Sequence, residues 1–295
     1  KKMERIASQI MDASQAPEAS SQRLAAMSVI AEVKGSDALG MLLQAAGDTD
    51  VAIRVGALRL ASAIKGSDAT KKWINRYGKV APEAKADILF MLGERGDELA
   101  VPLMMKAMDD PSREVSSSAL SALARLQGRK AVEPLLSWIV KYESEEGHLA
   151  AANALTTLLD STNIRMVAER LPESSGQASV TLIRLLAWSG DTRYFKTALP
   201  YTASDDLGIR AAALTSLSSL SSWNDQPAII ELLDNATDRA EVTQLQQALL
   251  SAAMRNDEPE NRSHIILKAL DKGAERIKLI PLLAVTGGDE ALKKV

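Results

Sequence analysis

Apolar residues recur along this chain with a period close to 31 residues. Met27, Leu58, Leu89 and Leu120 are each separated by 31 residues, and each lies in a helical pattern of apolar positions. Later equivalents follow at steps of 35, 27, 32, 35 and 30 residues: Leu155, Leu182, Leu214, Leu249 and Leu279. We call these nine residues the landmark positions. The period indicates stacked repeats, because one helix pair cannot bury its apolar face alone.

Each repeat is predicted to contain a helix A, a short turn, a helix B and a turn into the next repeat. The sequence Lys-Gly-Ser-Asp occurs at 34–37 and again at 65–68. Its glycine favours the left-handed conformation that ends helix A, and its Ser or Asp is suited to cap helix B. Two nearly identical turns 31 residues apart fix the register of the repeats.

The spacing of apolar residues predicts which face of each helix is buried. In helix A of the second repeat, expected over 51–64, the predicted buried face comprises Val51, Val55, Leu58 and Ala61 or Ser62. In helix B of the fourth repeat, expected over 131–142, it comprises Val132, Leu135, Leu136 and Ile139. Both follow the three- and four-residue spacing of a helix.

The array is predicted to be incomplete at both ends. Residues 3–11 carry the apolar pattern of a helix B from an earlier repeat, and the last repeat stops at Val295, a few residues into its own helix B. We therefore expect one repeat array over 1–295, with about eight helix pairs, that is a fragment of a longer multidomain protein.

Composition narrows the possible chemistry. Hydrophobic residues make up 46% of the chain but aromatic ones only 3%, so the core is expected to consist of aliphatic side chains. The net charge is -3 without long blocks of one sign, which argues against nucleic acid as a partner. The absence of cysteine excludes disulfides and cysteine nucleophiles. No stretch is apolar over about 20 residues, so no membrane insertion is expected.

The segment from Asp48 to Leu58 carries a family resemblance. Its Asp-Thr-Asp turn followed by Val-Ala-Ile-Arg resembles the inter-repeat turn and helix A entry of the HEAT-repeat family, in particular its short-unit, bilin-lyase-like type. The resemblance implies an all-α fold, an α-α superhelix with A helices on the convex side and B helices on the concave side.

The resemblance also implies a ladder of hydrogen bonds between adjacent turns. A cationic residue recurs four residues before the landmark, with an acidic residue four positions earlier in two repeats: Arg23, Arg54, Lys85 and Arg210, with Asp50 and Asp206. Such an Asp is expected to cap the first turn and to pair with the Arg at i, i+4. Ser116, Ala151 and Ala178 replace the cation in the central repeats, where the ladder is not continuous.

Two aromatic pairs are the least ordinary feature of the B helices. Trp73 with Tyr77, and Trp138 with Tyr142, are each spaced at i, i+4, and Tyr201 extends the series. One interpretation is a shared concave face that binds a peptide or a glycan, since Trp and Tyr supply large contact areas. The alternative is that these rings fill gaps between repeats.

No catalytic or metal-binding residues are predicted. The two histidines are far apart, and His148 and His264 are followed by Leu149 and Ile265, not by the glutamates of iron-binding HEAT-like enzymes. Both are expected in surface or capping roles. No cofactor is expected.

These observations predict a non-catalytic module that binds a protein partner or positions a neighbouring domain of the same chain. The family resemblance suggests a bacterial, exported and carbohydrate-related protein, periplasmic in preference to cytoplasmic. The alternative is a catalytic HEAT-like protein, such as a chromophore lyase that acts on a bound cofactor.

Overall fold

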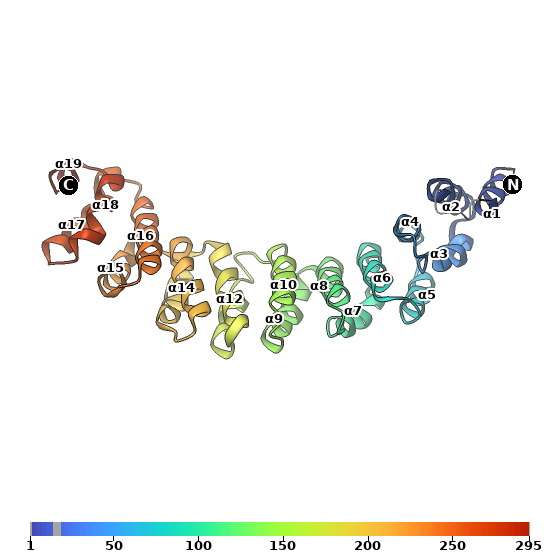
Figure 1. Ribbon diagram of the computed structural model, residues 1–295, viewed down its shortest axis with the longest axis horizontal. Coiled ribbons are helices and arrows are strands. Elements are labelled where there is room, and N and C mark those ends of the chain that lie inside the picture. Colours follow the sequence, from blue (N-terminus) through green and yellow to red (C-terminus); the bar gives the residue numbers. More distant parts are fainter. Residues whose placement is uncertain (1, 14–18, 295) are drawn as a thin grey trace. The chain divides into compact units, whose positions relative to one another are not determined.

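We describe residues 2–13 and 19–294 in a computed structural model, and these residues form helices joined by short turns, without a strand (Figure 1). The prediction of an all-α, HEAT-like solenoid is confirmed. A first helix, α1 (Lys2–Ala13), precedes the A helices. The A helices are α2 (Ser20–Lys34), α4 (Val51–Ser62), α6 (Pro82–Arg95), α8 (Arg113–Gln127), α10 (Glu145–Thr156), α12 (Gly176–Ser189), α14 (Leu207–Leu220), α16 (Arg239–Met254) and α18 (Arg276–Thr286).

The B elements are shorter, and most begin with a turn of 3₁₀-helix. In the first four repeats they are η2 (Gly35–Ala38) with α3 (Leu39–Ala45), α5 (Ser67–Tyr77), η3 (Glu98–Ala100) with α7 (Val101–Ala107), and η4 (Gly128–Ala131) with α9 (Val132–Lys141). They continue as α11 (Arg165–Arg170) with η5 (Leu171–Glu173), η6 (Thr192–Tyr194) with α13 (Phe195–Ala198) and η7 (Leu199–Ala203), η8 (Trp223–Asp225) with α15 (Gln226–Asn235), η9 (Pro259–Asn261) with α17 (His264–Asp271), and α19 (Asp289–Lys294).

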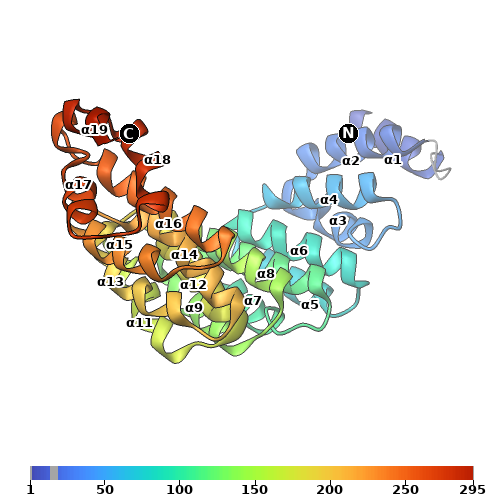
Figure 2. The ribbon, with the colours of Figure 1, turned by 60° about the vertical axis from the view of Figure 1, so that its left-hand side comes forward.

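The helices divide into two compact units. The first comprises Lys1–Trp138 and Asn153–Leu158, and the second comprises Ile139–Ala152 and Leu159–Val295. Within the first unit, α2 contacts α4, α4 contacts α6, and α6 contacts α8. Within the second, α12 contacts α14, α14 contacts α16, and α16 contacts α18, and Figure 2 shows α12, α14 and α16 as neighbours. That residues 1–295 form a single array stays a prediction.

All nine landmark positions are buried, with at most 4% of any side chain exposed. The predicted register is therefore confirmed. The fourth repeat also buries its predicted helix B face: Val132, Leu135, Leu136 and Ile139.

The predicted face of α4 is partly wrong. Val51 and Val55 are 59% and 48% exposed, and the buried residues are Ile53, Ala57, Leu58 and Ala61. Two helical stripes share Leu58 and Ala61, so spacing alone does not choose between them. Contacts of α4 with α2, α3 and α6 select the stripe that contains Ile53 and Ala57.

The turns after helix A follow the glycine prediction but not the predicted caps. Gly35 and Gly66 have φ angles of +55° and +106°, which favour glycine. Gly66 is itself the N-cap of α5, and no side chain caps that helix. Aspartates cap the corresponding elements of other repeats: Asp97 accepts a hydrogen bond from the Leu99 amide, and Asp191 from the Arg193 amide.

Asp50 and Asp206 cap their A helices. Asp50 accepts hydrogen bonds from the amides of Ala52 (2.8 Å) and Ile53 (3.4 Å), and also from the Ser20 hydroxyl of α2. Asp206 accepts from the amides of Gly208 and Ile209. The pKa of Asp50 lies below its ordinary value, mainly because of the Ser20 hydrogen bond.

The arginines bond neighbouring repeats instead of the aspartate at i−4. Arg23 of α2 binds the Asp48 carboxylate at 2.8 Å. Arg54 of α4 binds the Asp48 carbonyl at 3.2 Å and the Asp87 carboxylate of α6 at 2.6 Å. Three successive A helices are thereby linked through the Asp48 turn.

The other ladder positions differ between the two units. In the second unit, Arg210 binds Glu241 of α16 at 3.1 Å and the Ser204 carbonyl at 3.3 Å. In the first unit, the Lys85 ammonium lies 5.5 Å from the centre of the Tyr77 ring. In the fourth repeat, where Ser116 replaces the cation, the Ser118 hydroxyl donates to the Ala86 carbonyl of α6 at 2.6 Å.

A second inter-repeat device, which the sequence analysis missed, uses an arginine six residues after the landmark. Arg95, only 7% exposed, donates to the carbonyls of Ala61, Ile64 and Gly66 at the end of the preceding helix A. Arg255 does the same with the carbonyls of Ser219 (2.7 Å) and Ser221. The last carbonyls of a helix have no partner within the helix, and a cation at that end supplies this partner and complements the negative end of the helix dipole.

Asp97 and Thr70 complete the Arg95 network. The Arg95 guanidinium donates to the Thr70 hydroxyl at 3.3 Å, and that hydroxyl donates to Asp97 at 2.7 Å. The Thr70 hydrogen bond and the Leu99 amide hold the pKa of Asp97 below its ordinary value. Burial in turn lowers the pKa of Arg95.

Leu89→Ala is expected to lower the free energy of unfolding by about 2–5 kcal/mol, because it leaves a cavity between A helices. Chemical denaturation measures this loss. Leu149→Ala, at a position 63% exposed, is the matched control and should change stability by less than about 0.5 kcal/mol. Equal effects of the two substitutions would show that the register is wrong.

Arg95→Met keeps most of the side-chain stem but leaves the three carbonyls without their donor. We expect a loss of about 1–3 kcal/mol in the same assay, the range for hydrogen bonds from a charged donor. Arg59→Met, at an exposed position of α4, should have little effect. An Arg95→Met protein as stable as the parent would refute the structural role of this arginine.

Asp97→Asn should lower the thermal unfolding midpoint at neutral pH. A carboxyl whose pKa is lower in the folded state stabilises the fold above the pKa of the unfolded chain, and this stabilisation disappears as the pH falls through the folded value. The difference between parent and variant should therefore shrink below about pH 4. A difference that does not depend on pH would exclude this linkage.

Candidate functional site

The two tryptophans of the predicted aromatic face lie in the interior. Trp73 of α5 is 0% exposed, and Trp138 of α9 is 6% exposed. The Trp138 indole nitrogen donates to the Met108 carbonyl at 3.0 Å. This burial corrects the expectation that both rings form an exposed face on the B helices, because neither ring offers surface to a partner. Both occupy space between packed helices, which was the alternative interpretation.

Tyr77 is half-buried beside α6. Its hydroxyl is buried without a hydrogen-bond partner among the described residues. Burial, together with the nearby negative charge of Asp110, raises the pKa of Tyr77 to about 12. The phenol therefore stays neutral, and only part of its ring is accessible.

Tyr142 and Tyr201 are also only partly exposed. The Lys141 ammonium lies 4.7 Å from the centre of the Tyr142 ring, and burial raises the pKa of Tyr201. The role of Tyr77, Tyr142 and Tyr201 in partner binding stays a prediction.

His148 is buried, which corrects its expected surface position. Only 1% of the residue is exposed. Its Nδ1 lies 3.1 Å from the Thr181 hydroxyl, and its Nε2 contacts the Tyr142 carbonyl just beyond the end of α9. Both ring nitrogens thus face protein groups, as in a structural capping role. His264, by contrast, is exposed at the start of α17.

An exposed apolar groove runs between the A helices α4 and α6 of the first unit. Its volume is about 320 Å³. Phe90 and Val55, which are 53% and 48% exposed, form its accessible floor with Met91 and the landmark Leu58 beneath them. We call this feature the Phe90 groove.

Charged side chains line the Phe90 groove. The Arg125 guanidinium lies 4.6 Å from the centre of the Phe90 ring and forms an ion pair with Glu94. Arg59, Ser62 and Asp87 complete the lining. An apolar floor with a polar rim is typical of protein-binding surfaces.

The sequence carried a signal for Phe90 that was missed. The residue after the landmark is polar in the neighbouring repeats, where it is Ser28, Arg59 or Ser121. Phe90 is one of only two phenylalanines in the chain. A position that is polar in the neighbouring repeats is expected to face solvent. A large apolar residue at such a position indicates a binding surface and not a contribution to the core.

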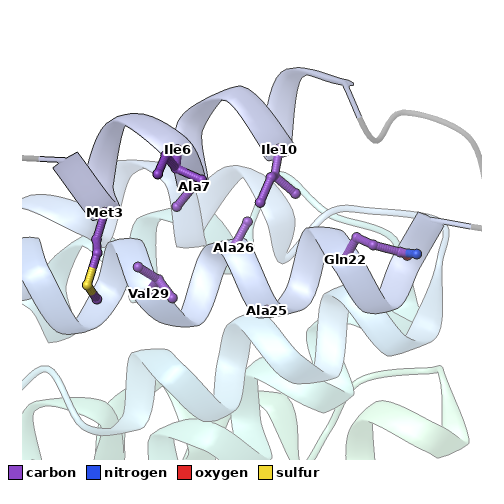
Figure 3. Close-up of a pocket in the computed structure, with 8 residues that line it drawn as sticks. All are labelled: Met3, Ile6, Ala7, Ile10, Gln22, Ala25, Ala26 and Val29. Carbon is purple, nitrogen blue, oxygen red and sulfur yellow. The ribbon is translucent and has the colours of Figure 1, made fainter.

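A second apolar groove of about 510 Å³ lies between α1 and α2 (Figure 3). Met3, Ile6 and Ile10 of α1 are 63%, 44% and 39% exposed. Ala26 and Val29 of α2 line the opposite side. The helix predicted over 3–11 is thus confirmed, and it packs on α2 through Ala7, Ala26 and Ile30.

In the second unit, Trp188 is 53% exposed beside a hollow that Asp160 and Asp191 also line. Both carboxylates are engaged locally. Asp160 accepts from the amide and hydroxyl of Thr162, and Asp191 forms an ion pair with Arg193 at 2.5 Å.

Among the described residues, no cluster of three or more histidines, aspartates or glutamates is arranged to hold a metal ion. Within the same residues, no helix has the length and apolar character needed to span a membrane.

None of the curated proteins matches the sequence. Among solved structures, one similar chain comes from the complex of CpcE and CpcF of phycocyanin lyase from Nostoc sp. PCC7120, at 16% identity and a TM-score of 0.37. The alignment covers 79% of this chain and 94% of that one. Human deoxyhypusine hydroxylase in complex with glycerol is similar at 14% identity and a TM-score of 0.37, over 85% and 97% of the two chains.

One segment of the sequence matches a known protein family. A protein family described as HEAT repeats matches residues 70–156, which extend from α5 to the end of α10. This segment contains the landmarks Leu89, Leu120 and Leu155 and the Arg95 network. The segment 70–156 thus consists of HEAT repeats, as the turn and helix-entry motifs predicted, and helix pairs repeat on either side of it.

Proposed function

We propose that this chain is a non-catalytic protein-interaction module whose Phe90 groove receives an apolar side chain of a protein partner. The proposal moves the predicted binding face from the B helices to the A helices α4 and α6. It keeps the partner class that the sequence suggested, either a separate protein or a neighbouring domain of the same chain. A bacterial origin, export and a glycan partner rest on the family resemblance alone.

The exposure of Phe90 carries the proposal. A half-exposed Phe ring beside an exposed Val leaves apolar area in water, where its removal by a partner is favourable at about 25 cal/mol per Å². The Arg125 guanidinium, which is paired with Glu94, lies over the Phe90 ring. Aromatic residues flanked by arginine are enriched at the centres of interfaces.

The rigidity of the surrounding helices supports the same function. The groove is formed by two helices whose landmarks, Leu58 and Leu89, are buried, and the Arg54–Asp87 ion pair of 2.6 Å joins them. A groove held in this way loses little conformational entropy when a partner binds.

Phe90→Ser should weaken partner binding at least tenfold, which corresponds to about 1.4 kcal/mol, a moderate effect for an interface aromatic. Peptides selected from a random displayed library against the chain serve as probes. Their affinities for parent and variant can be measured by fluorescence anisotropy, and NMR shifts locate the binding site.

Leu99→Ser is the matched control, because Leu99 is 44% exposed in the same unit and does not line the groove. Its affinity for the selected peptides should equal that of the parent. The proposal is refuted if the selected peptides bind the Phe90→Ser variant as tightly as they bind the parent chain. It is also refuted if the peptides shift no NMR signal of α4 or α6.

A further inference from the structure

We propose that the α4–α6 seam also contains an anion pocket that binds a carboxylate of the partner, next to the Phe90 groove. The inference rests on the proposed function and specifies the partner's chemistry. The pocket lies between the turns that lead into α4 and α6 and has a volume of about 430 Å³. Its lining includes Gly47, Asp48, Arg54, Arg76, Lys79 and Glu83.

Two cations of this pocket have no anion to balance them. Asp48 is paired with Arg23, and Arg54 with Asp87. No ion pair or hydrogen bond is found for the side chains of Arg76 and Lys79 within the described part of the chain, and the Arg76 Nε is buried without a partner. A buried guanidinium N–H without an acceptor is costly, and a carboxylate satisfies it through strong, charge-assisted hydrogen bonds.

The acidic side chains of the pocket do not remove this imbalance. The Asp48 carboxylate also accepts the Asp50 amide at 2.9 Å, so it is fully engaged. Glu83 is exposed in the first turn of α6, and within the described part of the chain it forms no ion pair or hydrogen bond with either cation.

The position of Arg76 depends on a close contact with Gly47. A Cβ at residue 47 would collide with the Arg76 Nη2, so the absent side chain leaves room for the guanidinium. Gly47 has no positive φ angle, and an alanine there would collide only with the flexible end of the Arg76 side chain, since its contact with the Gln44 carbonyl would be an ordinary 3.6 Å. Gly47→Ala therefore displaces the guanidinium with little effect on the fold.

The anion pocket and the Phe90 groove are adjacent along the same two helices. Arg54 lines the pocket and Asp87 lines the groove, and their ion pair separates the two. Along α6, Ala84 lines the pocket and Phe90 lines the groove. Six helical residues span about 9 Å, a distance that about three residues of extended peptide cover. The expected partner segment thus has an acidic residue about three positions from a large apolar one.

The test uses blocked four-residue peptides with glutamate at one end, leucine at the other and two alanines between, in both chain directions. Glutamine counterparts and inorganic phosphate are the comparison probes. NMR titration of the full chain should show that one glutamate peptide shifts the Arg76 Nε–H signal and the Phe90 ring. It should bind at least fivefold more tightly than its glutamine counterpart and more weakly at high salt.

Arg76→Gln and Gly47→Ala should each remove the preference for glutamate. Lys72→Gln, which removes an exposed lysine of α5 outside the pocket, is the matched control and should keep it. Equal unfolding midpoints of the variants show that the fold is intact. Arg76→Gln removes the positive charge, whereas Gly47→Ala keeps the charge and only displaces the guanidinium. The Gly47→Ala variant therefore shows whether the position of the guanidinium matters.

Three outcomes would overturn the anion pocket. If glutamate and glutamine peptides bind equally but Phe90→Ser weakens both, the Phe90 groove stands and the pocket does not. If phosphate shifts Arg76 but neither peptide does, the cations bind small anions and not a partner carboxylate. If no peptide shifts any residue of the seam, the anion pocket is refuted, and the library-selected peptides decide separately on the Phe90 groove.

Discussion

The structure depends on the burial of one apolar position per repeat between neighbouring A helices. Each landmark side chain is sealed from water within the stack, where a fully buried aliphatic side chain contributes about 1.5–3 kcal/mol. Because no repeat can do this alone, each layer stabilises the next, and stability accumulates along the array. With so few aromatic residues, the core consists of closely packed aliphatic side chains. The exceptions, such as Trp73 and Trp138, lie inside the packing.

Polar contacts between repeats act on the ends of helices, where backbone groups lack partners within the helix. Asp50 and Asp206 satisfy amides at the N-termini of their A helices, and Arg95 and Arg255 satisfy carbonyls at the C-termini of the preceding ones. These contacts fix how far one layer is offset from the next. They also keep the groove between α4 and α6 in a defined shape, because the Arg54–Asp87 pair lies within the same seam.

The candidate site follows from the same packing. Side chains that face a neighbouring layer are apolar and buried, so the residues left for binding lie along the seams and at the turns. There, Phe90 leaves half of its surface in water and the Arg76 Nε is buried without an acceptor, and both features cost free energy in the unbound chain. A partner that covers the ring and supplies a carboxylate repays both costs. The proposed function and the anion pocket therefore rest on one physical argument, the incomplete satisfaction of groups along the α4–α6 seam.

The sequence by itself determined the repeat, the register and the helix classes. Leu89 and its equivalents are spaced by the length of a repeat, and a helical period of 3.6 residues places them on one face. Gly35 and Gly66 marked turns because few other residues adopt their φ angles. Only the tertiary structure decided which of two overlapping stripes α4 buries, and it exposed Val51 and Val55. It likewise buried Trp73 and directed Arg54 to Asp87 instead of Asp50. These outcomes depend on which helix lies alongside, and the periodicity within a single helix does not contain that information.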